Sequence, residues 1–168
     1  RFNLKEVYMF NLFKKKDTNV NEICAPVKGK CIDITATKDP VFSGKMMGDG
    51  VAIIPESNVI KSPCSGTVTM FFPTKHAFGI TTNSGVEVLV HIGIETVNLN
   101  GKGFKSFVSK DQRINKGDKV ITFDSNYLSD SAMDMTTMVI ITNSADHPFE
   151  KNKLDTEVSE NDAIISLK

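Results

Sequence analysis

The stretch VEVLVHIGIETV, residues 86–97, places a histidine inside a run with the valine and isoleucine content of a β-strand. Successive side chains of a strand point to opposite faces, so this run has two distinct faces. One is entirely aliphatic and is expected in the core: Val86, Val88, Val90 and Ile92. The other combines a carboxylate, a leucine and the histidine: Glu87, Leu89 and His91. The alternation therefore predicts that His91 lies on the outward face of a half-buried strand.

The composition of the chain is that of an ordinary globular protein. Its 168 residues include 20 Lys plus Arg and 20 Asp plus Glu, so the formal net charge is zero. A nucleic-acid binder normally carries a basic excess, and the balance argues against that class. The three cysteines, Cys24, Cys31 and Cys64, have no metal-ligand spacing and predict reduced thiols in a cytoplasmic protein. No apolar run approaches the length of a membrane span.

Short apolar segments separated by turn residues predict an all-β fold, a sandwich or a barrel. The expected strands are Lys30–Thr35, Val51–Pro55, Gly66–Phe72, His76–Thr81, Val86–Ile92, Phe104–Val108, Lys119–Phe123, Thr137–Thr142 and Ala163–Leu167. The one expected helix is short, at Ser125–Met133.

Two pairs of segments repeat within the chain. APVKGKCIDI (25–34) is similar to SPCSGTVTM (62–70), and INKGDKVITF (114–123) is similar to VSENDAIISL (158–167). In the second pair a Gly or Asn can adopt the left-handed conformation of a tight turn, and the following Asp can accept a hydrogen bond from the turn backbone. The repeats predict a folded-over sandwich with approximate internal symmetry.

A second histidine is expected beside the first. The segment TNSG, residues 82–85, has the chemistry of a hairpin turn. A turn centred between Asn83 and Ser84 would place His76 directly opposite His91, with Cβ atoms about 4.5–5.5 Å apart. In that register Phe78 would face Leu89.

Paired imidazoles on one face suggest chemistry more than packing. Two rings this close disfavour double protonation, so one can be a neutral nucleophile while the other donates a hydrogen bond to the captured group. Thr74 lies two residues before His76 and can orient its ring. The alternative is that one histidine is a cross-strand packing residue.

The motifs VEVLVHIGIETV, TKHAFGI and MMGDGVAI together resemble the glucose-type IIA domain of the bacterial phosphoenolpyruvate-dependent sugar phosphotransferase system. The resemblance covers about residues 21–168. It implies a flat antiparallel β-sandwich with a duplicated hybrid motif and at most short helices. It also implies a phosphoryl relay, in which His91 accepts a phosphoryl group from phospho-HPr and passes it to a cysteine of the IIB domain of a membrane transporter.

The same resemblance implies roles for further residues. His76 would stabilise the phosphoryl group and Thr74 would hold His76. Asp39 and Glu95 match acidic positions that flank the family's site, although Glu95 stands where Asp is common. Because a protein donor must reach the acceptor, we expect an exposed apolar patch of partner-binding residues around it. The expected patch is Val41, Phe42, Met46, Met47, Phe72, Phe78 and Leu89.

No cofactor is expected to be required. Zinc at the His76 and His91 pair is a weaker hypothesis, because two histidines are too few for a closed site and a partner would have to supply a further ligand. The third histidine, His147 in ADHPFE, matches no site motif and is expected in a loop.

Three alternatives compete with the relay. A zinc hydrolase would need His-x-His, but Ile92 and Gly93 follow His91. A swinging-arm carrier is suggested by INKGDKV, yet neither repeat offers the lysine at a hairpin tip that such domains modify. A purely regulatory module that uses the apolar patch to bind target proteins stays open.

The first twenty residues are expected to be a flexible leader, followed by a single domain at 21–168. Met9 resembles a natural start of a free-standing protein, so residues 1–8 are interpreted as expression-derived or encoded upstream. Within the leader, the apolar and basic stretch Phe10–Lys16 could contact an anionic membrane. The identity of the sugar and the regulatory targets cannot be predicted from these residues.

Overall fold

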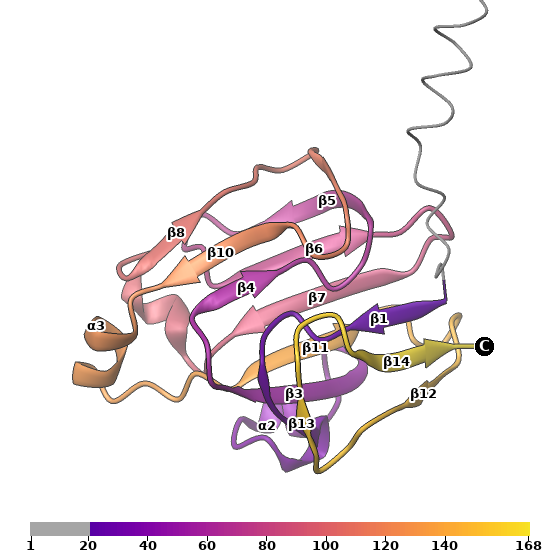
Figure 1. Ribbon diagram of the computed structural model, residues 1–168, viewed down its shortest axis with the longest axis horizontal. Helices are drawn as coiled ribbons and strands as arrows, with labels where there is room; N and C mark the ends of the chain where they lie inside the picture. The colour runs from indigo at the N-terminus through magenta and orange to yellow at the C-terminus, as the bar shows by residue number, and fades with distance from the viewer. Residues whose placement is uncertain (1–20) are drawn as a thin grey trace, which may run out of the picture.

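A computed structural model describes residues 21–168, and the leader with its expected membrane contact at Phe10–Lys16 lies outside the described residues. The fold is a sandwich of antiparallel sheets with short helices at its edges (Figure 1). The strands are β1 Glu22–Cys24, β2 Gly29–Asp33, β3 Asp49–Pro55, β4 Val59–Lys61, β5 Gly66–Phe71, β6 Ala77–Thr81, β7 Glu87–Ile92, β8 Phe104–Ser106, β9 Arg113–Ile114, β10 Lys119–Phe123, β11 Thr137–Ile141, β12 Phe149–Lys151, β13 Glu157–Val158 and β14 Ala163–Leu167. The helices are η1 Ile34–Ala36, α2 Pro40–Ser43, η2 Thr96–Leu99 and α3 Ser125–Asp130.

Every strand expected from the sequence is present, with small differences at its ends. The expected strand Lys30–Thr35 ends at Asp33, because the Asp33 carboxylate accepts the Thr35 N–H and caps η1. The short strands β1, β4, β9, β12 and β13 were not expected, since two or three residues carry too little alternation to recognise. The helix expected at Ser125–Met133 ends at Asp130. Within residues 21–168 the longest helix has 6 residues, far below the length of a bilayer span.

The strand order shows the predicted duplication. The eight-stranded sheet has the order β13-β2-β3-β11-β7-β6-β5-β9, and the two three-stranded sheets have the orders β1-β14-β12 and β4-β10-β8. The two repeats pair alike: Gly29 of β2 lies opposite Val158 of β13, and Gly66 of β5 lies opposite Ile114 of β9. The same hydrogen-bonded unit therefore occurs twice, once from β2 and β13 near the ends of the chain and once from β5 and β9 in its middle, which confirms the internal symmetry.

The repeated turns have the predicted chemistry. Gly117 and Asn161 both adopt the left-handed conformation, with φ of 87° and 68°. The next residue in each repeat, Asp118 or Asp162, accepts the backbone N–H of the residue three positions before it at 2.8 Å. The side-chain bond satisfies a turn donor that would otherwise need water.

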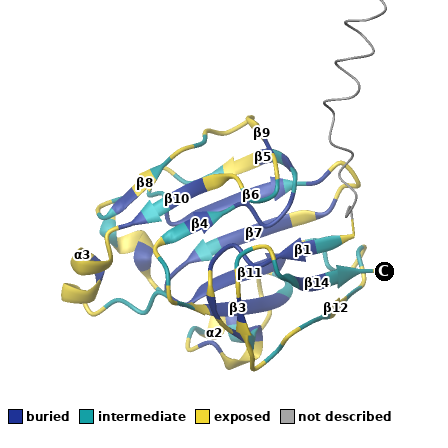
Figure 2. Ribbon diagram, viewed as in Figure 1, coloured by how far each residue is buried: buried dark blue, intermediate teal, exposed yellow. Residues whose placement is uncertain are grey.

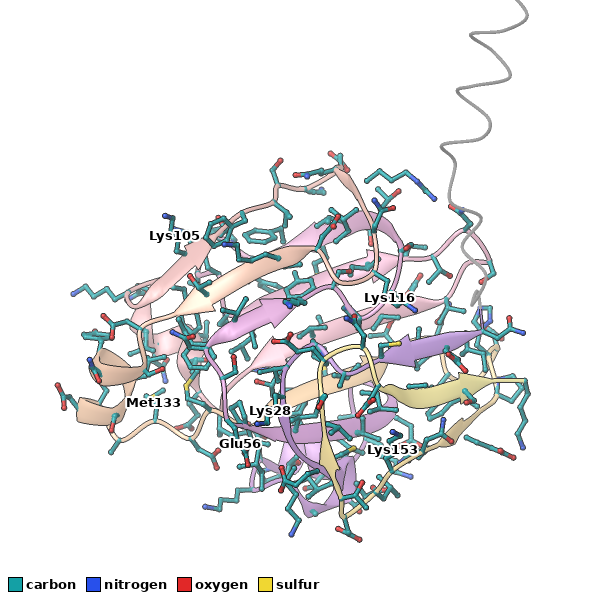
Figure 3. The ribbon with its side chains drawn as sticks, in the orientation of Figure 1. Lys28, Glu56, Lys105, Lys116, Met133 and Lys153 are labelled. Carbon is teal, nitrogen blue, oxygen red and sulfur yellow. The ribbon has the colours of Figure 1, made fainter. Side chains whose placement is uncertain are left out.

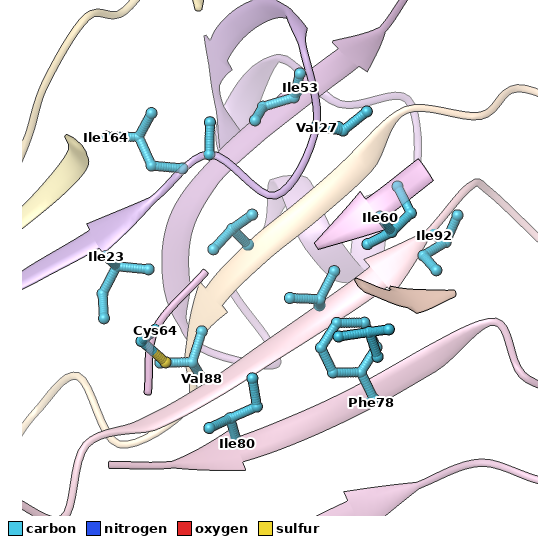
Figure 4. Close-up of a cluster of buried hydrophobic side chains, with 14 of the residues drawn as sticks. Ile23, Val27, Ile53, Ile60, Cys64, Phe78, Ile80, Val88, Ile92 and Ile164 are labelled. Atoms are coloured by element: carbon cyan, nitrogen blue, oxygen red, sulfur yellow. The ribbon is translucent and has the colours of Figure 1, made fainter. Parts of the chain in front are cut away.

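The main core lies between the eight-stranded sheet and the layer of shorter sheets in front of it (Figures 1 and 2). Val86, Val88, Val90 and Ile92 all lie in it, as the alternation predicts. Phe78 also lies in this core and is fully buried (Figure 4). The prediction that Phe78 belongs to a surface patch is therefore wrong.

The cause is a register one residue away from the predicted one. His91 lies opposite Ala77, not opposite His76, and Phe78 lies opposite Val90. The hairpin loop has three residues instead of two: Thr82 and Val86 close it, and Gly85 ends it with a φ of 87°. A three-residue loop ending in left-handed glycine is the next common hairpin after the two-residue turn. The slip moves Phe78 to the core face.

A smaller apolar cluster covers the opposite face of the eight-stranded sheet, beneath η1 and α2. Its buried members are Ile34, Phe42, Ala52, Ala77, Leu89, Met138 and Ile140. Phe42 and Leu89 were both expected on the surface. They are only 6% and 5% exposed, because both pack within this cluster. This second cluster is the floor on which the two histidines lie.

Candidate functional site

His91 lies near the end of β7, between two neighbouring strands of the large sheet. Its strand partners are Ala77 on β6 and Met138 on β11, both buried members of the smaller cluster. The His91 ring is half-buried and packs against Phe42, with ring centroids 4.7 Å apart. The imidazole is thus held by an apolar floor on one side while part of it stays accessible.

A backbone carbonyl decides which nitrogen of His91 carries the proton. Nδ1 of His91 lies 2.9 Å from the carbonyl oxygen of Gly93. A carbonyl oxygen can only accept, so Nδ1–H donates and Nε2 keeps its lone pair. Gly93 has a φ of 79°, which turns the chain directly after the strand and brings its carbonyl back to the ring.

The surroundings keep His91 neutral. Burial lowers the pKa of the His91 imidazole to about 4, and nearby His76 acts in the same direction. The hydrogen bond to Gly93 and the charge of Asp39 oppose this shift without cancelling it. At neutral pH the residue therefore presents a neutral imidazole with a free Nε2, which is a competent nucleophile.

His76 lies one residue before β6 and is almost completely buried. Its carbonyl oxygen accepts the N–H of Ile92 at 2.7 Å, which continues the hairpin ladder. Lys75, directly before it, has a φ of 56°. This left-handed residue breaks the strand alternation, so His76 need not follow Phe78 toward the main core. The side chain lies on the His91 side instead.

Thr74 holds the His76 ring, as predicted. Its Oγ1 lies 2.6 Å from Nδ1 of His76. If the threonine hydroxyl donates, Nδ1 accepts and Nε2 of His76 carries a proton. Burial also lowers the pKa of His76, so its ring is neutral at neutral pH.

The two rings meet edge to face despite the shifted register. The ring centroids of His76 and His91 are 4.9 Å apart and their planes are 81° apart. Phe72 packs against His76 at 5.3 Å. The predicted pairing of the histidines is thus confirmed, although the direct opposition across the ladder is not.

Of the two predicted acidic residues, only Asp39 acts on the pair. Its carboxylate caps α2 by accepting the Val41 N–H at 2.8 Å, and its charge raises the pKa of His91. Glu95 is exposed at the start of η2 with a φ of 58°. Among residues 21–168 no hydrogen bond or ion pair joins Glu95 to either histidine.

An apolar groove lies beside the histidines. The groove is formed by the segment that follows α2 and by strands β5 to β7. Its apolar lining includes Met46, Met47, Met70, Phe72 and Leu89. Val41, Met46 and Met47 are exposed, as expected of partner-binding residues, and Met46 is the most open at 75%. The sequence reasoning missed Met70, because alternation along β5 places it with the buried Val68, whereas a bulge between these two residues breaks the alternation and leaves Met70 49% exposed.

Within residues 21–168 no group of three or more His, Cys, Asp or Glu side chains could hold a metal ion. The histidine pair offers two nitrogens only.

The chain matches one family model and is similar to several named proteins. Residues 21–147 match the family described as phosphoenolpyruvate-dependent sugar phosphotransferase system, EIIA 1. The chain is 44% identical over 147 residues to the PTS system glucose-specific EIIA component of Mycoplasma capricolum, covering 88% of this chain and 95% of that protein. It is 44% identical over 135 residues to the component of the same name from Bacillus cereus, covering 80% and 81%.

A solved structure shares the fold. The glucose permease IIA from Mycoplasma capricolum superimposes with a TM-score of 0.82 at 44% identity, over 88% of this chain and 95% of that one.

Proposed function

Because the chain belongs to the EIIA 1 family of the phosphoenolpyruvate-dependent sugar phosphotransferase system, we propose that His91 is the residue that carries the phosphoryl group. The family makes the protein a phosphotransferase component of a phosphoryl relay in sugar uptake. The observation that supports His91 is its free Nε2, held neutral beside a second imidazole.

The proposed first step is an exchange of one N–P bond for another. Nε2 of His91 attacks the phosphorus of a phosphohistidine on HPr, and the bond to the HPr nitrogen breaks as the new bond forms. The nucleophile needs no base, because the proton of the ring is already on Nδ1 and held by Gly93. Phosphoryl transfer depends mainly on positioning and charge stabilisation. The hydrogen bond to Gly93 fixes the position of the His91 ring before the donor arrives.

His76 and Thr74 would stabilise the charged product. A phosphorylated ring carries about two negative charges at neutral pH. The Thr74 hydroxyl, donating to Nδ1 of His76, leaves the Nε2–H of His76 available to a phosphoryl oxygen. In the second step a cysteine thiolate of the IIB domain attacks the phosphorus, and the N–P bond to His91 breaks.

The groove beside the pair is the proposed docking surface for HPr and the IIB domain. Exposed methionines adapt to several partners, and Met46 and Met47 line this groove together with Phe72, whose ring packs against His76. Because the relatives from two organisms are named glucose-specific, glucose is the first sugar to test. Regulatory targets would bind the same groove, and zinc would bind the pair only in a complex whose partner supplies a carboxylate. A cytoplasmic location, supported by three cysteines that form no disulfide within residues 21–168, belongs to the same proposal.

The test is transfer of label from phosphoenolpyruvate through enzyme I and HPr. We expect acid-labile label on the wild type and on His76→Ala, and none on His91→Ala. His147→Ala is the matched control, since it removes the third histidine and leaves the pair intact. Onward transfer to IIB should be about 100-fold slower in His76→Ala, in the range that a positioned proton donor contributes.

Thr74→Val and Thr74→Ser separate orientation from packing. The valine has the shape of threonine without its hydroxyl and should slow onward transfer, whereas the serine keeps the hydrogen bond and should restore it. Label on His91→Ala would assign the acceptor role to another residue. No label on the wild type with a competent HPr would contradict the relay and favour a regulatory binding module.

A further inference from the structure

An exposed aromatic ring lies between two lysines on the outer face of the β4-β10-β8 sheet. Phe107, which follows β8, is 40% exposed. The Nζ atom of Lys119 lies 4.3 Å from the ring centroid, and that of Lys105 lies 5.2 Å from it. Figure 3 labels Lys105 on this layer, with its side chain directed away from the strands.

The surrounding segment concentrates the positive charge of a neutral chain. Residues 102–119 contain six basic and two acidic residues, a net charge of +4 in a protein whose total is zero. One of the two acidic groups, the Asp118 carboxylate, accepts a hydrogen bond from the backbone N–H of Asn115 within the turn. The basic residues are Lys102, Lys105, Lys110, Arg113, Lys116 and Lys119.

None of these six forms an ion pair with any residue in 21–168. By contrast, seven lysines elsewhere in the described chain are ion-paired: Lys28, Lys38, Lys45, Lys61, Lys151, Lys153 and Lys168. Of the described cations without an ion pair, six thus lie in this one segment, and the other two, Lys30 and Lys75, lie elsewhere.

This face lies on the opposite side of the sandwich from the histidines. Lys105 alternates with Phe104, which points into the main core from β8. His91 lies beyond that core, on the far face of the eight-stranded sheet with the smaller cluster. A partner bound at Phe107 would leave His91 and its groove open.

We propose that the outer face around Phe107, Lys105 and Lys119 docks onto an anionic phospholipid membrane. Lysine is depleted in protein–protein interfaces, whereas an exposed aromatic ring flanked by lysines suits the headgroup region, where the ring enters the interface and the ammonium groups meet phosphates. Docking there would hold the protein at the membrane with its groove directed toward other proteins. The proposal stands apart from the relay, because vesicle binding needs no phosphoryl transfer.

Fluorescence of a single tryptophan tests the contact directly. The sequence contains no tryptophan, so Phe107→Trp in the full chain creates a unique reporter. We expect its emission to shift to shorter wavelength with vesicles of phosphatidylcholine and phosphatidylglycerol, and not with phosphatidylcholine alone. Tyr127→Trp is the matched control, since Tyr127 is 38% exposed and lies on α3, outside the basic segment.

Charge removal tests the same contact by sedimentation with the anionic vesicles. Each lysine near an anionic surface strengthens binding about fivefold, so Lys105→Gln with Lys119→Gln should weaken it about 25-fold. The double variant Lys38→Gln with Lys45→Gln removes the same charge on the opposite face of the sandwich, where the smaller cluster lies. It should have little effect on vesicle binding. Binding should also weaken as salt is raised.

Three results would overturn the proposal. One is unchanged emission of Phe107→Trp while the chain sediments with vesicles, which would assign the contact to the leader. Another is equal weakening by both lysine pairs, which would mean unspecific charge attraction. The last is a blue shift of Phe107→Trp with the isolated IIB domain and none with anionic vesicles, which would assign the face to a protein partner.

Discussion

The carbonyl oxygen of Gly93 accepts a hydrogen bond from Nδ1 of His91 at 2.9 Å, two residues along the same chain. The bond exists because Gly93 leaves the strand with a φ of 79°. It sets the tautomer of the ring and its rotation together, so the free Nε2 points away from the backbone. The chemistry of His91 therefore depends on the backbone conformation of a glycine that contacts no substrate.

Gly93→Ala should disturb both stability and phosphorylation. A Cβ there would lie 3.0 Å from the Asp134 carbonyl oxygen and closer still to the Thr96 methyl group, in a backbone conformation that alanine disfavours. We expect a loss of about 2 kcal/mol in the free energy of unfolding and slower labelling of His91. Urea unfolding and the rate of label uptake from phospho-HPr measure the two effects.

Gly85→Ala is the control for backbone strain alone. Gly85 has a φ of 87°, and a Cβ at this position would meet nothing within 4 Å. It should cost about 1 kcal/mol and leave the labelling rate unchanged. Equal labelling rates in Gly93→Ala and wild type would show that the carbonyl does not position the ring.

The protein should lose stability as pH falls from about 6.5 to 4. His91 in the folded chain has its pKa lowered to about 4 by burial and by His76, while an unfolded histidine protonates near 6.5. Between these values the unfolded state binds the extra proton, so the histidine's contribution is full above pH 6.5 and declines below it. Urea unfolding at about pH 7 and pH 5 should show this decline, and His91→Gln should reduce it.

The ring protons of His91 offer a direct check by NMR. Their chemical shifts should titrate with a midpoint near 4 in the folded protein. A midpoint near 6.5 would mean that burial and His76 do not hold the ring neutral. The proposal that Nε2 of His91 is a neutral nucleophile would then lose its physical basis.

The features predicted correctly from the sequence are those that a few neighbouring residues determine. The buried face of β7 follows from alternation within the strand, and the repeated turns follow from Gly117 or Asn161 with the adjacent aspartate. The pairing of His76 with His91 was also predicted, although for a partly wrong reason. Lys75 breaks the strand with a φ of 56°, and this turn compensates for the one-residue error in register.

The features that were missed depend on contacts between distant segments. Asp39 followed by Pro40 is a helix-start signal, but a four-residue helix has no periodicity to show that α2 forms there and brings Phe42 over β7. Once Phe42 is there, Leu89 becomes part of a second core and leaves the surface. The loop length that moved Phe78 inward was equally ambiguous, since two-residue and three-residue hairpins share the same turn residues.

Lys151 should contribute to stability through two carboxylates from other strands. Its Nζ lies 2.7 Å from Asp49 and 3.0 Å from Asp33, and its side chain is 15% exposed. Lys151→Met would leave both carboxylates without this partner, so we expect a loss of about 1–2 kcal/mol at neutral pH by urea unfolding. Lys168→Met, which breaks an ion pair with Glu150 between two largely exposed side chains, should leave stability nearly unchanged.

The effect of Lys151→Met should shrink in acid. Burial by itself raises the pKa of Asp49, but the hydrogen bond and charge of Lys151 outweigh it and hold the pKa below its ordinary value of 3.8. A carboxyl with a lowered pKa stabilises the fold above its unfolded pKa and loses that contribution as pH falls further. A difference between wild type and variant that stays constant down to about pH 3 would contradict this account.

The three cysteines should be inert in the folded protein. Cys24, Cys31 and Cys64 are all buried in the main core or its edge. Burial, together with Asp155 and Asp33, raises the pKa of the Cys31 thiol to about 11, and burial also raises that of Cys24. The thiolate is the species that reacts, and here it is both scarce and inaccessible.

A chromogenic disulfide reagent measures this reactivity directly. Without denaturant the three native thiols should react only as fast as the fold opens, and in concentrated urea all three should react at once. Met46→Cys supplies a matched exposed thiol, since Met46 is 75% exposed. It should add one fast equivalent under native conditions. A native cysteine that reacts as fast as this added thiol would show that its part of the core opens independently of global unfolding.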